Sequence, residues 1–362
     1  MSATSAAFAL NGRRIAFGAV ASEPACSPTE TAVLATIQDW LTGAETFPLR
    51  TSGSTGTPKE ICLTRTQLRA SAARSVAALG LSAGDPTLVC LSIGTAGGLL
   101  GVVRALEHAL PLTLIDPTGD VLAVVGESSV FATTSLVPLQ VQAVLAHGAA
   151  GYAWLDRMKA VLIGGAAVSA ALESALQAVA APIYHTYGMT ETASHVALRR
   201  LNGPARTDYF TALPGIELRL NSQGALEIRA DVTNNEWLTT TDRAELIGAN
   251  WFRWLGRLDD VINSGGVKVD AARVQRAVEE ALRTHGLGHD VVVLGLLDAR
   301  LGEQVVAWLG GPALTATQEA NLRARLTSGL TRYEVPKELR VLPVLPRLPG
   351  GKIDRQTLRN RP

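Results

Sequence analysis

The stretch TSGSTGTPK, residues 51–59, carries the strongest chemical signal in the chain. Its nine positions hold two glycines, five hydroxyl side chains and one lysine. Glycines let backbone N–H groups approach an anion, hydroxyls add hydrogen-bond donors, and a lysine supplies a positive charge. The composition therefore predicts a loop that binds phosphate groups through Thr51, Ser52, Gly53, Ser54, Thr55, Gly56 and Lys59.

Two other interpretations of this loop have less support. A Walker A loop follows the pattern G-x-x-x-x-G-K-[ST], whereas no Ser or Thr follows Lys59. A P-loop phosphotransferase is therefore disfavoured. A flexible surface loop would explain the Ser, Thr and Gly content but not the Pro-Lys ending.

A second cluster is YGMTET, residues 187–192, which follows a short apolar stretch. The ring of Tyr187 could stack on a purine, and the carboxylate of Glu191 could bind magnesium near phosphate. Because a single Glu on a loop is usually only solvated, this cluster is weak alone. Combined with the phosphate loop, Asp242 and the segment GRLDDVINSGGVK at residues 256–268, it becomes highly specific.

Three patterns along the chain predict the elements that position these side chains. Between about residues 30 and 200, β-rich runs alternate with Ala-rich helical patterns, which indicates βα units around a largely parallel sheet. Residues 216–228 alternate polar and apolar around a turn, which predicts an antiparallel hairpin in a barrel-like subdomain. After residue 259 a helix (270–284), a strand (291–297) and a second helix (317–330) predict a small α/β domain.

Composition and charge restrict the class of protein. With 362 residues, 47% hydrophobic and 18% charged, the chain is expected to be globular, with two or three domains. A formal charge of +1 gives no long-range attraction to nucleic acid or to a membrane surface. The three cysteines are an odd number without CxxC spacing, which disfavours a disulfide framework and structural zinc and favours the cytoplasm.

Two segments could be mistaken for membrane or targeting signals. Residues 87–103 carry no charge, but four glycines interrupt them, which favours a strand, a turn and a helix start over a membrane span. The N-terminus lacks the basic region of a secretory signal. Its acid-poor start weakly resembles a transit peptide, yet Asn11-Gly12 predicts a type I′ hairpin over residues 8–17.

In their order along the chain, these motifs resemble those of the adenylate-forming superfamily, which includes acyl- and aryl-CoA synthetases, luciferases and peptide-synthetase adenylation domains. TSGSTGTPK is similar to the phosphate loop, YGMTE to the adenine and magnesium segment, and TTTD to the motif with the ribose-binding Asp. GRLDD is similar to the interdomain hinge, and PGGK to the segment with the catalytic lysine. The resemblance implies that a carboxylate attacks the α-phosphate of MgATP, releasing pyrophosphate, and that a thiol then displaces AMP.

The resemblance also implies a role for each matching residue. Lys59 and the loop amides would hold the β- and γ-phosphates, Thr190 would donate to the α-phosphate, and Glu191 would bind Mg²⁺. The implied catalytic residues are Lys352, Thr190 and Glu191, and the implied nucleotide-binding residues beyond the loop are Gly164, Gly165, Ala166, Tyr187, Asp242 and Arg257.

The implied fold is α/β with two domains. Residues 1–258 would form a large AMP-binding domain with parallel-rich layered sheets and the barrel-like subdomain. Residues 259–362 would form a small, mobile domain that rotates about a hinge at Asp259 and exchanges Lys352 for a CoA-facing surface at Gly265 and Gly266. Only 50 residues precede the phosphate loop, so part of the usual N-terminal subdomain is expected to be absent or replaced.

Within the superfamily, YGMTETAS and the short chain most resemble o-succinylbenzoate-CoA ligases of menaquinone biosynthesis. The small Thr95 would leave room for an aromatic acid, and His195 is either an acyl-pocket residue or a structural histidine. Arg104 and Arg199 are candidates for binding a second substrate carboxylate, because an unpaired buried charge is costly.

Several alternatives stay open. Other aryl- or acyl-CoA ligases, a carrier-loading adenylation domain and a non-catalytic nucleotide-binding homologue share parts of the pattern. The last is disfavoured because Lys59, Glu191, Asp242, Arg257 and Lys352 are all present. The expected ligands are ATP, Mg²⁺, coenzyme A and a small carboxylic acid, with no nucleic acid and no membrane span. The acid, the thiol acceptor and the oligomeric state, including a homodimer, are left open.

Overall fold

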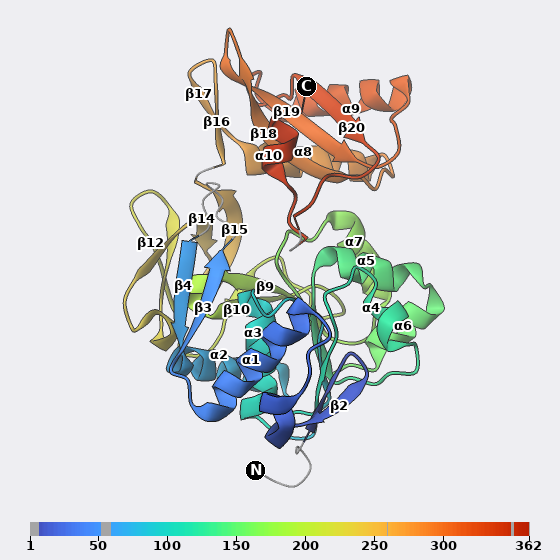
Figure 1. Ribbon diagram of the computed structural model, residues 1–362. Helices are drawn as coiled ribbons and strands as arrows, with labels where there is room; N and C mark the ends of the chain where they lie inside the picture. The colour runs from blue at the N-terminus through green and yellow to red at the C-terminus, as the bar shows by residue number, and fades with distance from the viewer. Residues whose placement is uncertain (1–6, 52–58, 259, 349–350, 362) are drawn as a thin grey trace.

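The computed structural model describes residues 7–51, 59–258, 260–348 and 351–361. Figure 1 shows them as two bodies, the large part, up to residue 258, and the small part, from residue 260, which lies above it. The C-terminal part of the chain descends from the small part towards helices α5 (Pro138–Ala146) and α7 (Ala170–Ala175) of the large part (Figure 1).

A mixed sheet of thirteen strands forms the centre of the large part, in the order β12-β13-β14-β15-β11-β10-β9-β8-β7-β5-β6-β1-β2. Strands such as β8 are buried along their whole length, as parallel strands covered on both faces are. Six neighbouring strands are parallel: β9 (Ile183–Met189), β8 (Ala160–Ile163), β7 (Thr133–Leu136), β5 (Thr87–Val89), β6 (Leu112–Leu114) and β1 (Ala7–Leu10).

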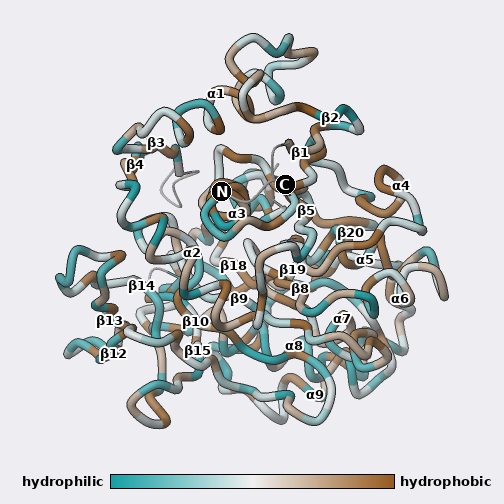
Figure 2. Tube along the Cα trace, turned by 90° about the horizontal axis from the view of Figure 1, so that it is seen from below, coloured by the Kyte–Doolittle hydropathy of each residue, from teal (hydrophilic) through white to brown (hydrophobic). Residues whose placement is uncertain are grey.

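The strands expected in a barrel-like subdomain instead continue this sheet, because β15 pairs with β11 and β11 pairs with β10. The outermost hairpin, β12–β13, is largely hydrophilic at its rim, as its teal colour in Figure 2 shows. The antiparallel strands are β10 (Ser194–Arg200), β11 (Phe210–Ala212), β12 (Glu217–Leu220), β13 (Ala225–Arg229), β14 (Leu238–Leu246), β15 (Trp251–Arg257) and β2 (Arg13–Ala16). A separate hairpin pairs β3 (Thr46–Thr51) with β4 (Lys59–Thr64).

Helices cover both faces of the large sheet and bury one apolar core on each. One core includes side chains of α1 (Pro28–Thr42), α2 (Arg65–Leu79) and α3 (Ala96–Glu107). The other includes side chains of α4 (Val121–Val125), α5 (Pro138–Ala146), α6 (Ala149–Asp156) and α7 (Ala170–Ala175). Short 3₁₀ turns are η2 (Phe17–Ser22), η3 (Leu176–Ala178), η4 (Thr190–Thr192) and η5 (Asp231–Thr233).

Local sequence explains where the helices begin and end. The Ser27 side chain accepts a hydrogen bond from the Glu30 N–H at the start of α1, and Pro28 occupies the first turn. The helix ends at Gly43, whose φ of 89° suits a residue without a Cβ. In α2, Thr64 and Gln67 form a reciprocal capping box.

The small part has a five-stranded sheet of its own, with α8 (Ala271–Thr284) and α9 (Ala316–Gly329) on one face and α10 (Arg355–Arg359) on the other. The order is β17-β16-β19-β18, and β20 pairs with β19. One apolar core lies between this sheet and the helices α8 and α9, and a smaller one on the opposite face includes Leu358 of α10. The elements are β16 (Val261–Ser264), β17 (Val267–Asp270), α8 (Ala271–Thr284), β18 (Asp290–Asp298), β19 (Gly302–Gly310), α9 (Ala316–Gly329), β20 (Glu338–Leu342) and α10 (Arg355–Arg359). The two predicted helices and the strand lie within one residue of their expected ends.

The two segments that could be mistaken for targeting or membrane signals adopt the predicted structures. Asn11 and Gly12 both have positive φ, 48° and 80°, as a type I′ turn requires, and β1 joins the parallel sheet beside β6. Residues 87–103 form β5, a turn and the start of α3. Among the described residues, no helix has both the length and the apolar character to span a membrane.

A tight helix contact between α5 and α6 provides a test of this packing. A Cβ at Gly151 would lie 1.9 Å from the Val144 carbonyl oxygen, so Gly151→Ala forces backbone to move. We expect a loss of about 2 kcal/mol or more in the free energy of unfolding, measured by urea denaturation. Gly329→Ala, in α9 with open space around it, is the matched control and should be neutral or slightly stabilising. Equal effects of both changes would contradict this packing.

Candidate active site

The candidate site lies at the carboxyl ends of the parallel strands. The chain leaves β5 and β7, which are neighbours, towards opposite sides of the sheet, since β6 lies beyond β5 and β8 beyond β7. Such a point of reversal leaves a crevice where ligands bind in open α/β sheets. The turns that follow β5, β7, β8 and β9 therefore meet at one edge, and they contain Thr95, Val137, Gly164 and Thr190.

Asp242 lies on β14, in the antiparallel part of the sheet, and its carboxylate accepts hydrogen bonds from two aromatic side chains. The Tyr187 hydroxyl donates to Oδ2 at 2.8 Å, and the Trp254 indole N–H donates to Oδ1 at 3.0 Å. Arg257 is the cross-strand partner of Asp242 in the β14–β15 ladder. The structure therefore brings together the predicted Tyr187, Asp242 and Arg257, and adds Trp254.

The Tyr187 ring is fixed by two phenylalanines. It packs edge-on against Phe252, with centroids 5.0 Å apart, and tilted against Phe210 at 5.7 Å. Burial, and then the adjacent Asp242 carboxylate, raise the pKa of its hydroxyl. Tyr187 therefore stays a hydrogen-bond donor to Asp242 at physiological pH.

Thr190 and Glu191 occupy a tight turn between β9 and β10. The Thr192 hydroxyl accepts a hydrogen bond from the Met189 N–H at 3.0 Å and closes the turn. Two successive non-glycine residues, Ala193 and Ser194, have positive φ of 49° and 84°. Such backbone is uncommon and concentrates at functional segments. Glu191 is half-buried here.

The predicted glycine segment follows β8 and packs closely against β9. A Cβ on Gly164 would lie 2.4 Å from the Thr186 hydroxyl oxygen, and Gly165 has φ of 79°. The Ala166 carbonyl lies 3.3 Å from His185 Nε2. Gly164, Gly165 and Ala166 thus form a wall beside the strand that carries Tyr187.

The turn that carries Lys352 contacts the large part at this same edge. A Cβ on buried Gly351 would lie 3.2 Å from a Val137 methyl group, next to the end of β7. Arg347 fixes the turn by donating to the Gly351 carbonyl at 2.9 Å and to Asp290 Oδ2 at 2.6 Å. The Lys352 side chain is exposed.

Gly265 and Gly266 are not brought to this edge. They form the turn of the β16–β17 hairpin with φ of 62° and 81°, and Gly265 lies against Leu301 and Tyr333 of the small part. Figure 1 shows this hairpin pointing away from the large part. Lys352 and the glycine turn therefore lie on different sides of the small part.

Some predicted residues lie outside the described part of the chain, namely Ser52, Gly53, Ser54, Thr55, Gly56 and Asp259. The two ends of the predicted phosphate loop are described. Thr51 and Lys59 pair with each other at the end of the β3–β4 hairpin opposite the Thr46–Thr64 pair.

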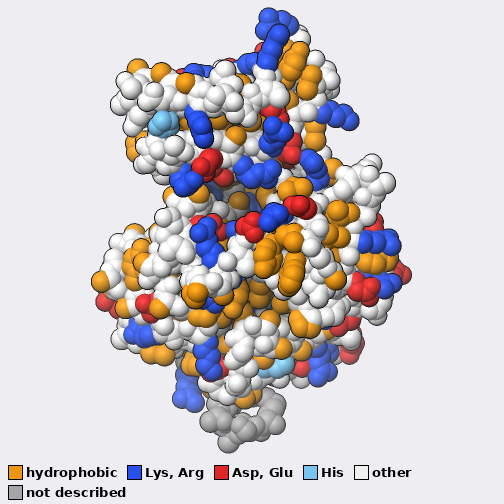
Figure 3. Space-filling view, turned by 180° about the vertical axis from the view of Figure 1, so that it is seen from behind, with side chains coloured by type: hydrophobic (Ala, Val, Ile, Leu, Met, Phe, Trp, Pro, Cys, Tyr) orange, Lys and Arg blue, Asp and Glu red, His pale blue; other side chains and the backbone are white. Residues whose placement is uncertain are grey.

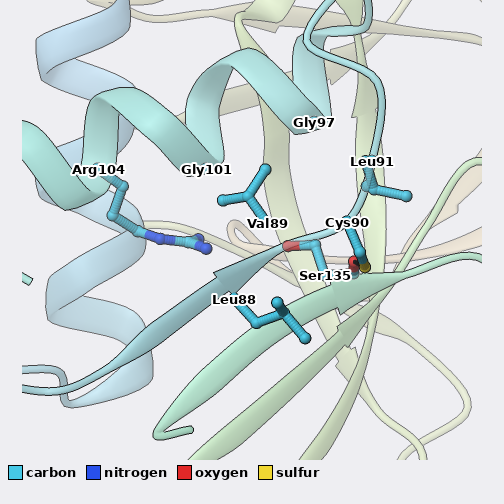
Figure 4. A pocket seen from close by; sticks show the side chains of 8 residues that line it. All are labelled: Leu88, Val89, Cys90, Leu91, Gly97, Gly101, Arg104 and Ser135. Atoms are coloured by element: carbon cyan, nitrogen blue, oxygen red, sulfur yellow. Dashed lines mark hydrogen bonds between the residues drawn. The ribbon is translucent and has the colours of Figure 1, made fainter. Parts of the chain in front are cut away.

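Beneath the turn after β5 lies a narrow cleft that leaves no room for a water molecule between the surrounding side chains (Figure 4). Its lining includes Val89, Gly97, Gly101 and Ser135, and Arg104 of α3 points towards it. Thr95 is not among the lining residues. Its hydroxyl donates to the Ser92 carbonyl at 2.7 Å and accepts from the N–H of residue 98, so it caps α3.

Arg104 is a buried cation without an ion pair among the described residues. Only 1% of it is exposed, and its one described hydrogen bond runs from Nη1 to the Ser75 hydroxyl at 2.9 Å. Burial lowers the pKa of Arg104 to about 10, so it is charged at neutral pH. Arg199, the other candidate, instead forms an ion pair with Glu173 at 2.6 Å.

The comparisons identify the family. The sequence model described as "AMP-binding enzyme" matches residues 49–230. A probable 2-succinylbenzoate–CoA ligase of Mycobacterium tuberculosis is 31% identical over 334 residues, which cover 86% of this chain and 83% of that protein. This chain belongs to the AMP-binding enzyme family.

Solved structures agree with the fold of this AMP-binding enzyme. An acyl-CoA synthetase (AMP-forming)/AMP-acid ligase II-like protein from Dyadobacter fermentans is 36% identical with a TM-score of 0.62, covering 93% of this chain and 96% of that one. E. coli MenE with bound OSB-AMS is 24% identical with a TM-score of 0.70, covering 86% and 67%. The first alignment covers nearly all of both chains, and the second supports the α/β fold.

Sequence reasoning missed three residues of this AMP-binding enzyme's site: Trp254, Arg347 and Asp290. Arg347 and Asp290 lie 57 positions apart, and no local pattern marks them as partners. Trp254 lies three positions before Arg257 on β15, a spacing that strict strand alternation would place on opposite faces, so only the irregular register of the β14–β15 ladder brings its indole to Asp242.

His195 is a buried residue of β10, opposite Gly188, and its Nε2 has no hydrogen-bond partner among the described residues. Burial, and then the charges of Arg104 and Arg74, lower the pKa of His195 to about 3. Burial, and then Arg199, lower the pKa of His185 to about 4. Both imidazoles are therefore neutral in the folded enzyme at neutral pH.

These pKa values predict acid sensitivity of the fold. Between the folded pKa values and the unfolded value near 6.5, only the unfolded chain gains the proton, so stability falls as pH falls below about 6.5. From about pH 7 to about pH 5.5, each histidine should cost about 1 kcal/mol in the free energy of unfolding. His195→Gln should remove its share, measured by urea unfolding at both pH values. An unchanged pH dependence in His195→Gln would contradict the assigned burial.

Proposed function

We propose that this AMP-binding enzyme is an ATP-dependent carboxylate–CoA ligase whose acid is o-succinylbenzoate. The single observation that carries the ligase activity is the placement of the Lys352 turn against Val137, at the sheet edge where the Thr190–Glu191 turn also lies. A lysine delivered there can neutralise charge as a carboxylate attacks phosphorus.

The nucleotide is proposed to bind along this edge. Lys59 and the loop from Thr51 would hold the β- and γ-phosphates, and Thr190 would donate to the α-phosphate. Asp242 would accept from the ribose hydroxyls, with its carboxylate oriented by Tyr187 and Trp254. The remaining proposed contacts are adenine stacking on Tyr187, the wall of Gly164, Gly165 and Ala166, and a donor from Arg257.

Mg²⁺ is proposed to bind at Glu191. The described residues contain no group of three or more His, Cys, Asp or Glu side chains that could hold a metal by themselves. One half-buried carboxylate on a tight turn fits Mg²⁺, which typically takes one or two carboxylates together with substrate phosphates. The ion would supply charge neutralisation at the phosphates.

The proposed chemistry has two steps. A carboxylate oxygen of the acid bonds to the α-phosphorus while the bond to pyrophosphate breaks, with Lys352 beside both reacting groups. The sulfur of CoA then bonds to the acyl carbon, its proton is released, and AMP leaves with the electron pair of the acyl–oxygen bond. Because Gly265 and Gly266 lie away from Lys352 on the small part, we propose that they face the site only in the second step, after rotation about Asp259.

The proposed acid rests on Arg104 and on the relative named above. A buried guanidinium with one described hydrogen bond suits an anion that is not consumed by the reaction, and the narrow cleft beside Arg104 would have to widen to admit that anion. o-Succinylbenzoate carries such a second carboxylate. His195 lies near the Arg104 charge and would contribute a neutral imidazole.

We also propose a reducing compartment, the cytoplasm, for this enzyme. All three cysteines are free, and Cys26 and Cys62 are exposed. Exposed free thiols persist where the redox poise keeps them reduced.

The role of Lys352 can be tested by separating the two half-reactions. Lys352→Ala should slow adenylate formation about 10²–10³-fold and leave thioester formation from supplied acyl-adenylate largely intact. Pyrophosphate release and thioester formation are measured separately, with Lys337→Ala, another exposed lysine of the small part, as the control. An equal loss in both half-reactions would contradict the proposed role.

The acid can be tested with a panel of carboxylates. o-Succinylbenzoate should exceed benzoate and medium-chain fatty acids by well over tenfold in kcat/KM, because only it offers a partner to Arg104. Arg104→Met should reduce this preference while benzoate turnover persists, and Arg199→Gln should leave it unchanged. A wild-type preference for a monocarboxylic acid would refute the proposed acid and leave the ligase proposal standing.

A further inference from the structure

A β-bulge lies directly beside the proposed ribose contact. In the β14–β15 ladder Asp242 pairs with Arg257 and Arg243 with Gly256, but the next pair joins Ala244 to Trp254. Leu255 therefore has no partner residue opposite it, which is the pattern of a bulge. Bulges redirect backbone groups and side chains, and here both are directed towards the small part.

Three contacts cross from this bulge to the N-terminal half of α8. Arg243 Nη1 donates to Asp270 Oδ2 at 2.7 Å, and Arg276 Nη1 donates to the Leu255 carbonyl at 2.9 Å. A Cβ on Gly256, whose φ is 124°, would lie 2.4 Å from the Ala272 Cβ, so glycine permits the close approach. Figure 3 shows charged side chains gathered along the hollow between the two parts.

Asp270 has two functions in this junction. Its Oδ1 accepts from the Arg273 N–H at 3.1 Å and caps α8, while Oδ2 takes the hydrogen bond from Arg243. Through this hydrogen bond Arg243, the residue after Asp242, restrains the orientation of α8. The helix cap would persist with an amide in place of the carboxylate, so the two functions can be separated.

We propose that Arg243 and Arg276 are positioning residues, which hold the small part in the orientation where Lys352 reaches the large part. This inference rests on the proposed function. The Lys352 turn and the Gly265–Gly266 turn lie on different sides of the small part, so one orientation cannot serve both half-reactions. The Arg243–Asp270 pair therefore favours adenylate formation and must break before the thioester step.

The strength of the pair suits a contact that breaks in every cycle. The side chains of Arg243 and Asp270 are 37% and 24% exposed, so solvent and salt screen their attraction. A half-exposed pair of this kind biases an equilibrium by about two- to fivefold without trapping it.

The test compares Arg243→Gln, Asp270→Asn and the double variant in the full chain. Arg243→Gln and Asp270→Asn should each slow single-turnover adenylate formation about two- to fivefold. Thioester formation from supplied adenylate should be unchanged or faster in both variants. Because the two residues form one pair, the double variant should form adenylate only marginally more slowly than either single variant. Arg253→Gln is the matched control, because Arg253 lies on the same strand and its ion pairs with Asp208 and Glu245 stay within the large part.

A second readout does not depend on activity. Small-angle X-ray scattering should show a larger maximum dimension for Arg243→Gln and Asp270→Asn than for wild type and Arg253→Gln. Unchanged scattering, equal slowing of both half-reactions, or fully additive effects in the double variant would each overturn the positioning role. A wild-type chain that forms no adenylate would refute the proposed function, while scattering would still decide whether the contact orients the small part.

Discussion

The common alignment of the parallel strands is the constraint on which the site depends. Because β5, β7, β8 and β9 run in the same direction in one sheet, their following turns meet at one edge. Helices on both faces hold this alignment by burying apolar side chains of the strands on each side. The Asp242 network is built onto the same sheet by β14 and β15, so the proposed nucleotide contacts and the proposed reacting groups share one rigid support.

The small part adds what the sheet cannot supply. The proposed two steps need a lysine that enters and leaves the site, and Lys352 stands on a turn fixed within the small part by Arg347 and Asp290. Because this turn is preorganised, the proposed exchange requires movement of the small part as a whole. The bulge beside Asp242 then connects the position of that part to the nucleotide side of the large sheet.

Much of this arrangement could be predicted from the sequence, for identifiable reasons. Asn11-Gly12 and the helix of residues 271–284 depend on local backbone preferences and apolar periodicity, and both form as expected. The continuity of β15 with β11 depends on long-range pairing, which no local pattern encodes. The capping role of Thr95 is local and typical of threonine at a helix start, whereas the burial of Arg104 emerges only from packing, and the pairing of Arg199 with Glu173 joins separate elements.

Oxygen-isotope transfer tests the central claim most directly. o-Succinylbenzoate labelled with ¹⁸O in its carboxylates is incubated with ATP, Mg²⁺, CoA and the enzyme, and the nucleotide product is analysed by mass spectrometry. The proposed attack on the α-phosphorus predicts AMP that carries one ¹⁸O atom, because the carboxylate oxygen stays with phosphorus when the thiol displaces AMP. Label in inorganic phosphate with ADP as the product, or AMP without label, would contradict an acyl-adenylate route.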